Sequence, residues 1–290
     1  MSRQKKGGNL QEILKTTVES FTKTKLSTSL ETAVVKQLND LFSDEWKQKT
    51  FAVRSSAVGE DGSEASFAGQ METFLGVAGI KEICHAIIKC WASSFTQQAV
   101  EYRRNHGQVV AADVGVCVQE MVKADAAGVL FTRDPVSGNP GVMSINVSYG
   151  IGEAVVSGVT EPDTIFLHRS FYDKLSIKER IIGSKCVRID VSESGGVQEI
   201  ETDAKGECSL ADESALELGN IGIQVEKSFS DARDIEFAVK DGQIYLLQAR
   251  PITSLNMESE YELMHEQDSQ LLIDDELHTH ANTGEMMHRR

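Results

Sequence analysis

The sequence predicts an α+β fold with helices and mixed sheets rather than a run of strand–helix–strand units. Helical spacing of apolar residues dominates the N-terminal part, whereas from about residue 114 short apolar runs alternate with Asp, Pro and Gly, as successive strands do. The chain has 290 residues, 40% of them apolar and 25% charged, which is typical of a globular protein with a sizeable core. No internal repeat is visible.

The N-terminal part is predicted to begin with two helices, over residues 10–23 and 29–46, the second behind the cap candidates Ser27 to Ser29. The elements expected next are a strand, a loop rich in Gly, Ser and acids, a returning strand and a long helix, over residues 51–56, 57–70, 71–77 and 80–104. We expect residues 1–49 to form a helical segment ahead of a main domain over 50–253.

The rest of the chain is predicted to be mainly β. Strands are expected over 114–122, 128–132, 143–147 and 164–168, then further strands within 176–202, a helix over 210–229 and a hairpin over 234–249. Turns are expected at Gly183 and at Gly195-Gly196. Residues 254–290 are polar, acid-rich and methionine-rich, and we expect a linker or tail there.

Charge and cysteine content narrow the class of protein. A net charge of -15 argues against general binding to nucleic acid or anionic membranes, because both are polyanions. The five cysteines are odd in number and lack C-x-x-C spacing, which favours free thiols in a reducing compartment over disulfides or zinc. Neither a secretory signal nor an apolar run of ~20 residues is visible, so the sequence predicts a cytoplasmic protein without a membrane span.

Arg54 is the first candidate for binding phosphate. It lies on the predicted strand that opens into the small-residue loop 59–70. Small residues let backbone N–H groups approach phosphate oxygens, and an arginine at the base of such a loop supplies a forked cation. The alternative is a strand arginine paired with Glu60 or Asp61 beside an ordinary surface loop, and the spacing leaves both open. The segment matches neither the Walker nor the Rossmann pattern.

The predicted hairpin is the second candidate, and its register decides the interpretation. A two-residue Asp-Gly turn alone sets Glu236 opposite Leu247, whereas a three-residue turn or a bulge sets it opposite Gln248. We prefer the second register because it gives one wholly apolar face. That face is expected to set Ile235, Phe237 and Val239 against Ala249, Leu247 and Tyr245.

The other face of the hairpin carries chemistry suited to a metal and a phosphate. Glu236 and Gln248 offer hard oxygen ligands of the kind that Mg²⁺ takes, and Arg250 adds a guanidinium one step on. An edge hairpin with a solvated polar face remains the alternative on these residues alone. A third, weaker candidate is the strand end at 116–122, where free backbone groups and Met121 suit an adenine ring, although a core strand explains the pattern as well.

Several motifs, taken in order, resemble the ATP-binding domain of phosphoenolpyruvate synthase, pyruvate phosphate dikinase and rifampicin phosphotransferase. They are Phe51–Ala57, Ser66–Leu75, Val118–Val122, Gly128–Pro135, Gly152–Gly158 with Pro162-Asp163, and Asp234–Phe237 with Leu247–Pro251. The resemblance covers about residues 50–253 and implies an ATP-grasp fold, in which two α+β lobes hold ATP, with the N-terminal lobe incomplete here. It implies ATP and Mg²⁺ as cofactors.

The resemblance also implies roles for single residues. Arg54 and Arg250 resemble the two phosphate-binding, catalytic arginines, and Glu236 and Gln248 resemble metal ligands. The remaining nucleotide-binding positions are Gly69 and Thr73 for the phosphate loop, Gln119, Met121 and Val122 for the adenine-binding hinge, and Glu153 near ribose or phosphate.

Members of this family pass the β-phosphoryl group of ATP to a histidine on a separate domain, or by way of it to a drug hydroxyl. The implied partner is therefore a separate phosphohistidine-domain protein or further C-terminal domains, because His278 and His280 resemble a linker and not the acceptor. The Gly-Gly-Lys segment that normally opens the family is not matched. A non-catalytic, truncated nucleotide-binding or regulatory module is consequently the alternative to an ATP-dependent phosphotransferase.

Overall fold

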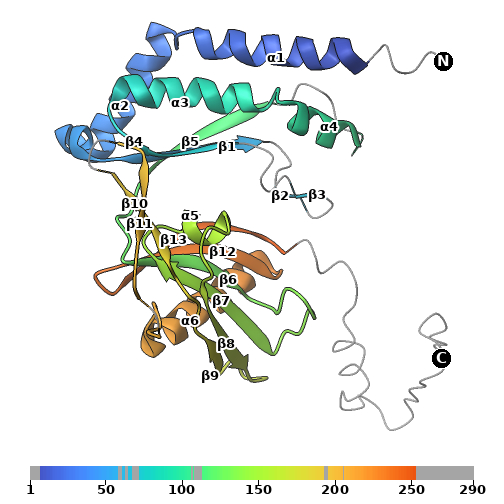
Figure 1. Cartoon of the computed structure of the whole chain (residues 1–290), viewed down its shortest axis with the longest axis vertical. Coiled ribbons are helices and arrows are strands. Elements are labelled where there is room, and N and C mark those ends of the chain that lie inside the picture. Colours follow the sequence, from blue (N-terminus) through green and yellow to red (C-terminus); the bar gives the residue numbers. More distant parts are fainter. Residues whose placement is uncertain are drawn as a thin grey trace, which may run out of the picture.

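The chain folds into two lobes that face each other, with the N-terminal helices on the outer side of one lobe (Figure 1). The computed structural model describes residues 7–57, 61–62, 65–66, 72–105, 107, 113–192, 195–204 and 206–252. The α+β class is confirmed. The strands pair in antiparallel ladders, and Gly150 and Ile189 form an isolated parallel bridge.

The N-lobe is a three-stranded sheet, in the order β4-β1-β5, covered on one face by helices. Its elements are α1 (Gly7–Lys23), α2 (Thr28–Phe42), the 3₁₀ helix η1 (Ser43–Gln48), β1 (Phe51–Ala57), β4 (Thr73–Val77), α3 (Ile80–Ser93), α4 (Gln97–Asn105) and β5 (Val114–Glu120). The short strands β2 (Asp61–Gly62) and β3 (Ala65–Ser66) pair beyond β1. The core joins Leu38 and Trp46 of the N-terminal helices to Phe51, Val53 and Ile83 of the sheet and α3.

Two helix predictions in this lobe were too long. The helix expected over 80–104 is divided into α3 and α4, because Ser93 and Ser94 hydrogen-bond back to carbonyls of their own turn and Thr96 caps the next helix through Ala99 N, at 3.3 Å. The helix expected over 29–46 ends at Phe42, and Ser43 follows with a φ of 51° before the 3₁₀ turn.

The C-lobe is a six-stranded sheet in the order β13-β12-β6-β7-β8-β9. Its elements are β6 (Ala126–Phe131), β7 (Val142–Tyr149), α5 (Glu153–Val156), β8 (Asp163–Arg169), β9 (Leu175–Ile181), β10 (Val187–Val191), β11 (Val197–Glu201), α6 (Asp212–Phe229), β12 (Arg233–Lys240) and β13 (Gln243–Pro251). The strands and the last helix therefore form close to where the sequence predicts them. The predicted tail over 254–290 lies outside the described residues.

The helix α6 covers one face of the C-lobe sheet and buries the main core of the lobe. Buried side chains such as Leu130, Ile235 and Phe237 point from the sheet into this core. The helix lies close to the strands because it presents glycines: a Cβ on Gly222 would lie 2.5 Å from Leu130 Cδ2. The opposite face of the sheet is left for α5 and the N-lobe.

The lobes are joined by the segment between β5 and β6 and by a second contact through the hairpin β10–β11. At the tip of that hairpin Gly196 N donates a hydrogen bond to Gly76 O on β4, at 2.8 Å. A small apolar cluster also spans the junction, with buried Ile151 and Ile189 against Leu75, Met121 and Val191. Within the described part of the chain, no helix has the length and apolar character to cross a membrane.

Candidate functional site

The hairpin of β12 and β13 has the register that sets Glu236 opposite Gln248, as predicted. A bulge at Leu247 produces it, while the turn stays at two residues, with positive φ at Asp241 and Gly242. The expected apolar partners beyond the bulge were wrong. Because the bulge consumes Leu247, Phe237 pairs with Leu246 and Val239 with Ile244, whereas Ile235 pairs with Ala249 as expected.

Alternation along β12 aims Glu236 away from the C-lobe core. Ile235 and Phe237 are fully buried beneath the sheet, so Glu236 between them projects from the face that meets the N-lobe. Its cross-strand neighbour Gln248 projects from the same face of the hairpin. A carboxylate and an amide oxygen are thereby held side by side on a buried scaffold.

Arg54 reaches these two residues from the other lobe. On β1 its neighbour Val53 is buried against the helices of the N-lobe, so Arg54 points from the opposite face of the sheet. Its Nη1 donates to Glu236 Oε2 at 3.1 Å and to Gln248 Oε1 at 3.0 Å. Arg54, Glu236 and Gln248 therefore form one cluster between the lobes, whereas Glu60, one of the partners that the sequence left open, lies outside the described residues.

Thr73 and Cys117 flank Arg54 on the two neighbouring strands. Thr73 is its partner on β4 and Cys117 its partner on β5. Directly paired residues share one face of a sheet, so both side chains, which are exposed, lie on the face that Arg54 uses. The register therefore brings the predicted phosphate-loop residue Thr73 beside Arg54. The other predicted loop residue, Gly69, lies outside the described residues.

Arg250 is held within the hairpin itself. Its Nε donates to Asp234 Oδ2 at 2.8 Å, and the two residues are cross-strand partners. Burial raises the pKa of the Asp234 carboxyl, an effect that the Arg250 guanidinium partly offsets. Sequence reasoning missed Asp234 as the partner of Arg250, although the register that it preferred for Glu236 sets these two residues opposite each other.

Glu153 begins the short helix α5, which rests on the site face of the C-lobe sheet near β6. Burial raises the pKa of its carboxyl, the charge of Glu236 raises it further, and the Arg54 guanidinium lowers it in part. Glu153 therefore stands within electrostatic reach of both residues. This places the weakest of the sequence candidates beside the central cluster.

The predicted adenine hinge lies where the chain passes between the lobes. Gln119 alternates with Cys117 on β5 and shares its face, and Met121 packs in the cluster of Ile151 and Leu75. Met121 N donates a hydrogen bond to Thr50 O at 2.9 Å, whereas the backbone amide of Val122 has no hydrogen-bond partner among the described residues. A backbone amide without a partner next to a methionine has the chemistry to bind a flat heteroaromatic ring, and the adenine-binding role of this segment stays a prediction.

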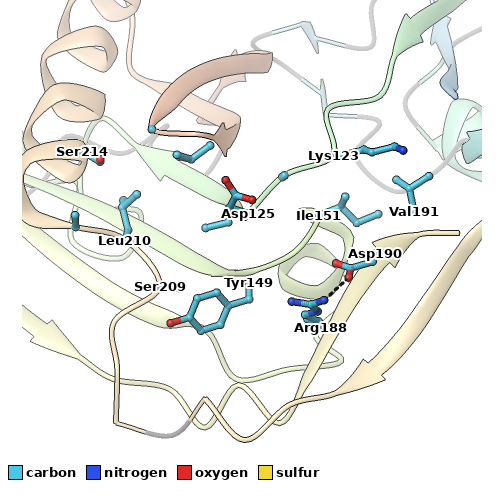
Figure 2. Close-up of a pocket in the computed structure, with 15 residues that line it drawn as sticks. Lys123, Asp125, Tyr149, Ile151, Arg188, Asp190, Val191, Ser209, Leu210 and Ser214 are labelled. Atoms are coloured by element: carbon cyan, nitrogen blue, oxygen red, sulfur yellow. Dashed lines mark ion pairs between the residues drawn. The ribbon is translucent and has the colours of Figure 1, made fainter. Parts of the chain in front are cut away.

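A separate hollow of about 630 Å³ adjoins the hinge at the end of the C-lobe sheet (Figure 2). The segment after the hinge, from Lys123 to Ala126, forms part of its lining, and so do Tyr149 and the ion pair of Arg188 with Asp190, at 2.8 Å. None of the predicted site residues in the described part of the chain lines it. The hollow and the Arg54 cluster are therefore distinct places in the fold.

The cluster combines two oxygen donors of the kind that Mg²⁺ takes with one guanidinium. The Glu236 and Gln248 oxygens converge on one guanidinium nitrogen, so a cation already lies where both can reach it. Among the described residues, no group of three or more His, Cys, Asp or Glu side chains is placed to hold a metal by itself. Mg²⁺ bound to nucleotides typically takes one or two carboxylates and fills its shell with phosphates and water, which these two ligands fit.

The comparison with known proteins agrees with this geometry. Residues 3–271 match the family described as the pyruvate phosphate dikinase AMP/ATP-binding domain. The chain belongs to this family. The match begins ahead of residue 50 and ends beyond 253, and the proposed division at those residues stays a prediction.

Its relatives include several phosphotransferases. Rifampicin phosphotransferase of Bacillus subtilis (strain 168) is 40% identical over 228 residues, which cover 77% of this chain and 25% of that protein. The probable phosphoenolpyruvate synthase of Methanocaldococcus jannaschii is 40% identical over 212 residues, which cover 71% of this chain and 17% of that protein. The probable phosphoenolpyruvate synthase of Archaeoglobus fulgidus is 37% identical over 238 residues, which cover 80% of this chain and 31% of that protein. The chain thus spans less than a third of each of these relatives.

A buried ion pair supports this ATP-binding domain from within the C-lobe. Asp163 and Lys185 are both fully buried, with Nζ 2.5 Å from Oδ1. The same carboxylate accepts from Gly183 N and from the amide and hydroxyl of Ser209, so it ties β8 to two connections of the lobe. Asp163 was visible in the sequence only as part of a motif, and nothing in the local pattern marked Lys185 as its partner.

Proposed function

We propose that this AMP/ATP-binding domain binds Mg-ATP between its two lobes and supplies phosphoryl groups to an acceptor. One observation carries the proposal. Arg54 of one lobe meets Glu236 and Gln248 of the other, so a cation and two oxygen ligands converge across the junction of the lobes. A triphosphate there would meet cationic side chains from both sides.

The residues divide the work of binding. Arg54 and Arg250 supply forked, permanently charged donors for phosphate oxygens, and Glu236 and Gln248 would hold the magnesium ion. When bound, Mg²⁺ neutralises phosphate charge during transfer. Met121 and Val122 at the hinge would receive the adenine, with Gln119 beside them. Phosphoryl transfer depends mainly on positioning and charge neutralisation, and the cluster is equipped for both.

The acceptor is proposed from the relatives. Their names refer to rifampicin and to phosphoenolpyruvate. We infer that the phosphoryl group passes first to a histidine on a further domain or a separate protein, and then to pyruvate or to a small alcohol. The choice between those acceptors would lie in parts of the relatives that this chain does not match.

Calorimetry with Mg-ATP tests the proposal. We expect saturable binding to the purified chain, and no measurable heat at millimolar nucleotide would remove the assignment. Release of AMP and phosphate, assayed in the same samples, then separates a catalytic from a purely binding role for this chain. Binding without AMP would leave nucleotide binding intact and place the chemistry with a partner.

A further inference from the structure

One guanidinium nitrogen occupies the position that a metal ion would need. Arg54 Nη1 lies 3.1 Å from Glu236 Oε2 and 3.0 Å from Gln248 Oε1. A magnesium ion bound to the same oxygens would lie at ~2.0–2.1 Å from each, on the side where the nitrogen now sits. Two cations do not share that space, because the low dielectric of a half-buried site strengthens their repulsion.

The charges of the cluster require replacement of the arginine and not simple loss. The Glu236 carboxylate interacts electrostatically with Glu153, and Arg54 is the cation that faces both. If Arg54 swings away with nothing in its place, two half-buried carboxylates are left to repel each other. Departure of the arginine is therefore favourable only when another cation arrives.

Arg54 also has an N–H donor that is not used in these two hydrogen bonds. Its Nε is buried and has no hydrogen-bond partner among the described residues. A guanidinium has five N–H donors, and phosphate oxygens accept them in bidentate geometry. A polyphosphate entering the cleft thus offers the arginine a better set of partners than the two oxygens it now contacts.

We propose that Arg54 and the divalent metal exchange places, so that the metal site opens only when nucleotide phosphate draws the arginine away. In the nucleotide-free chain the arginine closes the site and connects the lobes. The inference rests on the proposed function, because it takes Glu236 and Gln248 as the metal ligands. Its consequence is that metal alone binds weakly, and that metal and nucleotide strengthen each other's binding.

The contrast with Arg250 fits this exchange. Arg250 is hydrogen-bonded to Asp234, its cross-strand partner on its own hairpin. Of the two arginines proposed to bind phosphate, only Arg54 touches the ligand oxygens in the described structure.

The test is a titration of the chain with Mn²⁺, without nucleotide, followed by electron paramagnetic resonance of the free ion. Arg54→Gln should bind Mn²⁺ more tightly than the wild type by roughly 5- to 150-fold, the usual range of coupling between linked binding events. Arg54→Lys keeps the charge and should fall between the two. Lys47→Gln, which removes an equal charge from an exposed ion pair with Asp44, should match the wild type.

The double variant with Glu236→Gln identifies the site. Adding that substitution to Arg54→Gln should abolish the gain in Mn²⁺ affinity. Equal Mn²⁺ affinity in the wild type and both Arg54 variants, with binding still dependent on Glu236, would overturn the exchange and leave the metal site standing. If Glu236→Gln changes nothing in any background, with or without an ATP analogue, the metal assignment itself fails and the exchange falls with it. Thermal unfolding of each variant checks that it is folded.

Discussion

The two halves of the proposed nucleotide site are built in different ways. The C-lobe half is fixed by strand register, since Glu236 with Gln248 and Asp234 with Arg250 are cross-strand pairs over a buried core. The N-lobe half offers Arg54, which reaches out of its own sheet and finds its partners in the other lobe. The C-lobe side chains are positioned by their own hairpin, whereas the Arg54 side chain is positioned by its contacts with the other lobe. The C-lobe should therefore govern stability and metal choice, and the N-lobe should respond to the nucleotide.

The largest effect is expected from Asp163→Asn, which breaks a buried ion pair of the C-lobe and should lower the stability of the fold. The change leaves Lys185 fully buried without its counter-charge, and we expect a loss of ~3–5 kcal/mol in the free energy of unfolding. Denaturant unfolding measures it. Asp44→Asn is the matched control, because Asp44 pairs with Lys47 at the exposed surface and its loss should cost far less. Equal losses would show that the buried pair is not special.

Glu236→Ala should come next and should act on ligand binding. Removing a proposed metal ligand should weaken Mg-ATP binding by about tenfold or more, since even the loss of supporting groups of metal sites weakens metal binding 10–100-fold. ATP in EDTA should lose much less affinity, because no metal is then held. Calorimetry with and without Mg²⁺ gives both numbers. Glu179→Ala, on the exposed edge strand β9, is the control, and similar losses with and without metal would count against Glu236 as a ligand.

The same comparison explains how much the sequence could predict. The register that pairs Glu236 with Gln248 followed from the need for a uniform apolar face, which is a local property of one hairpin. The bulge at Leu247 was one of two ways to reach that register, and the pattern did not separate them. The break between α3 and α4 depends on hydroxyl groups that compete with helical hydrogen bonds, so apolar periodicity passed over it.

Contacts between distant segments were beyond the sequence. Arg54 is separated from Glu236 by 182 residues, and only the packing of two lobes decides that they meet. Lys185 pairs with Asp163 because the connection between β9 and β10 folds back onto β8, and no local sequence pattern predicts this contact. Family motifs singled out Arg54, Glu236 and Gln248, but they did not show that the arginine would contact the other two residues.

A smaller effect is expected from Glu153→Gln. Burial and Glu236 raise the pKa of Glu153 in the folded chain above its unfolded value, so the stabilising contribution is present at low pH and lost as pH rises through the folded pKa. The amide avoids this loss, and we expect Tm to rise by ~1–2 °C at pH 7 and not at pH 4. Differential scanning calorimetry of the wild type and the variant at pH 7 and pH 4 measures this change in Tm. A rise of equal size at pH 4 would contradict the electrostatic cause.

The most direct measurement of a nucleotide between the lobes uses a thiol already in place. Cys117 is exposed and pairs with Arg54 across the strands, whereas Cys186 is exposed on the C-lobe connection before β10. Burial raises the pKa of Cys90 to about 12, so this thiol should stay unmodified at pH 8. Alkylation can be followed peptide by peptide with mass spectrometry. We predict that Mg-ATP slows modification of Cys117 severalfold and leaves Cys186 unchanged; an unchanged rate at Cys117 under saturating Mg-ATP would contradict binding in this cleft.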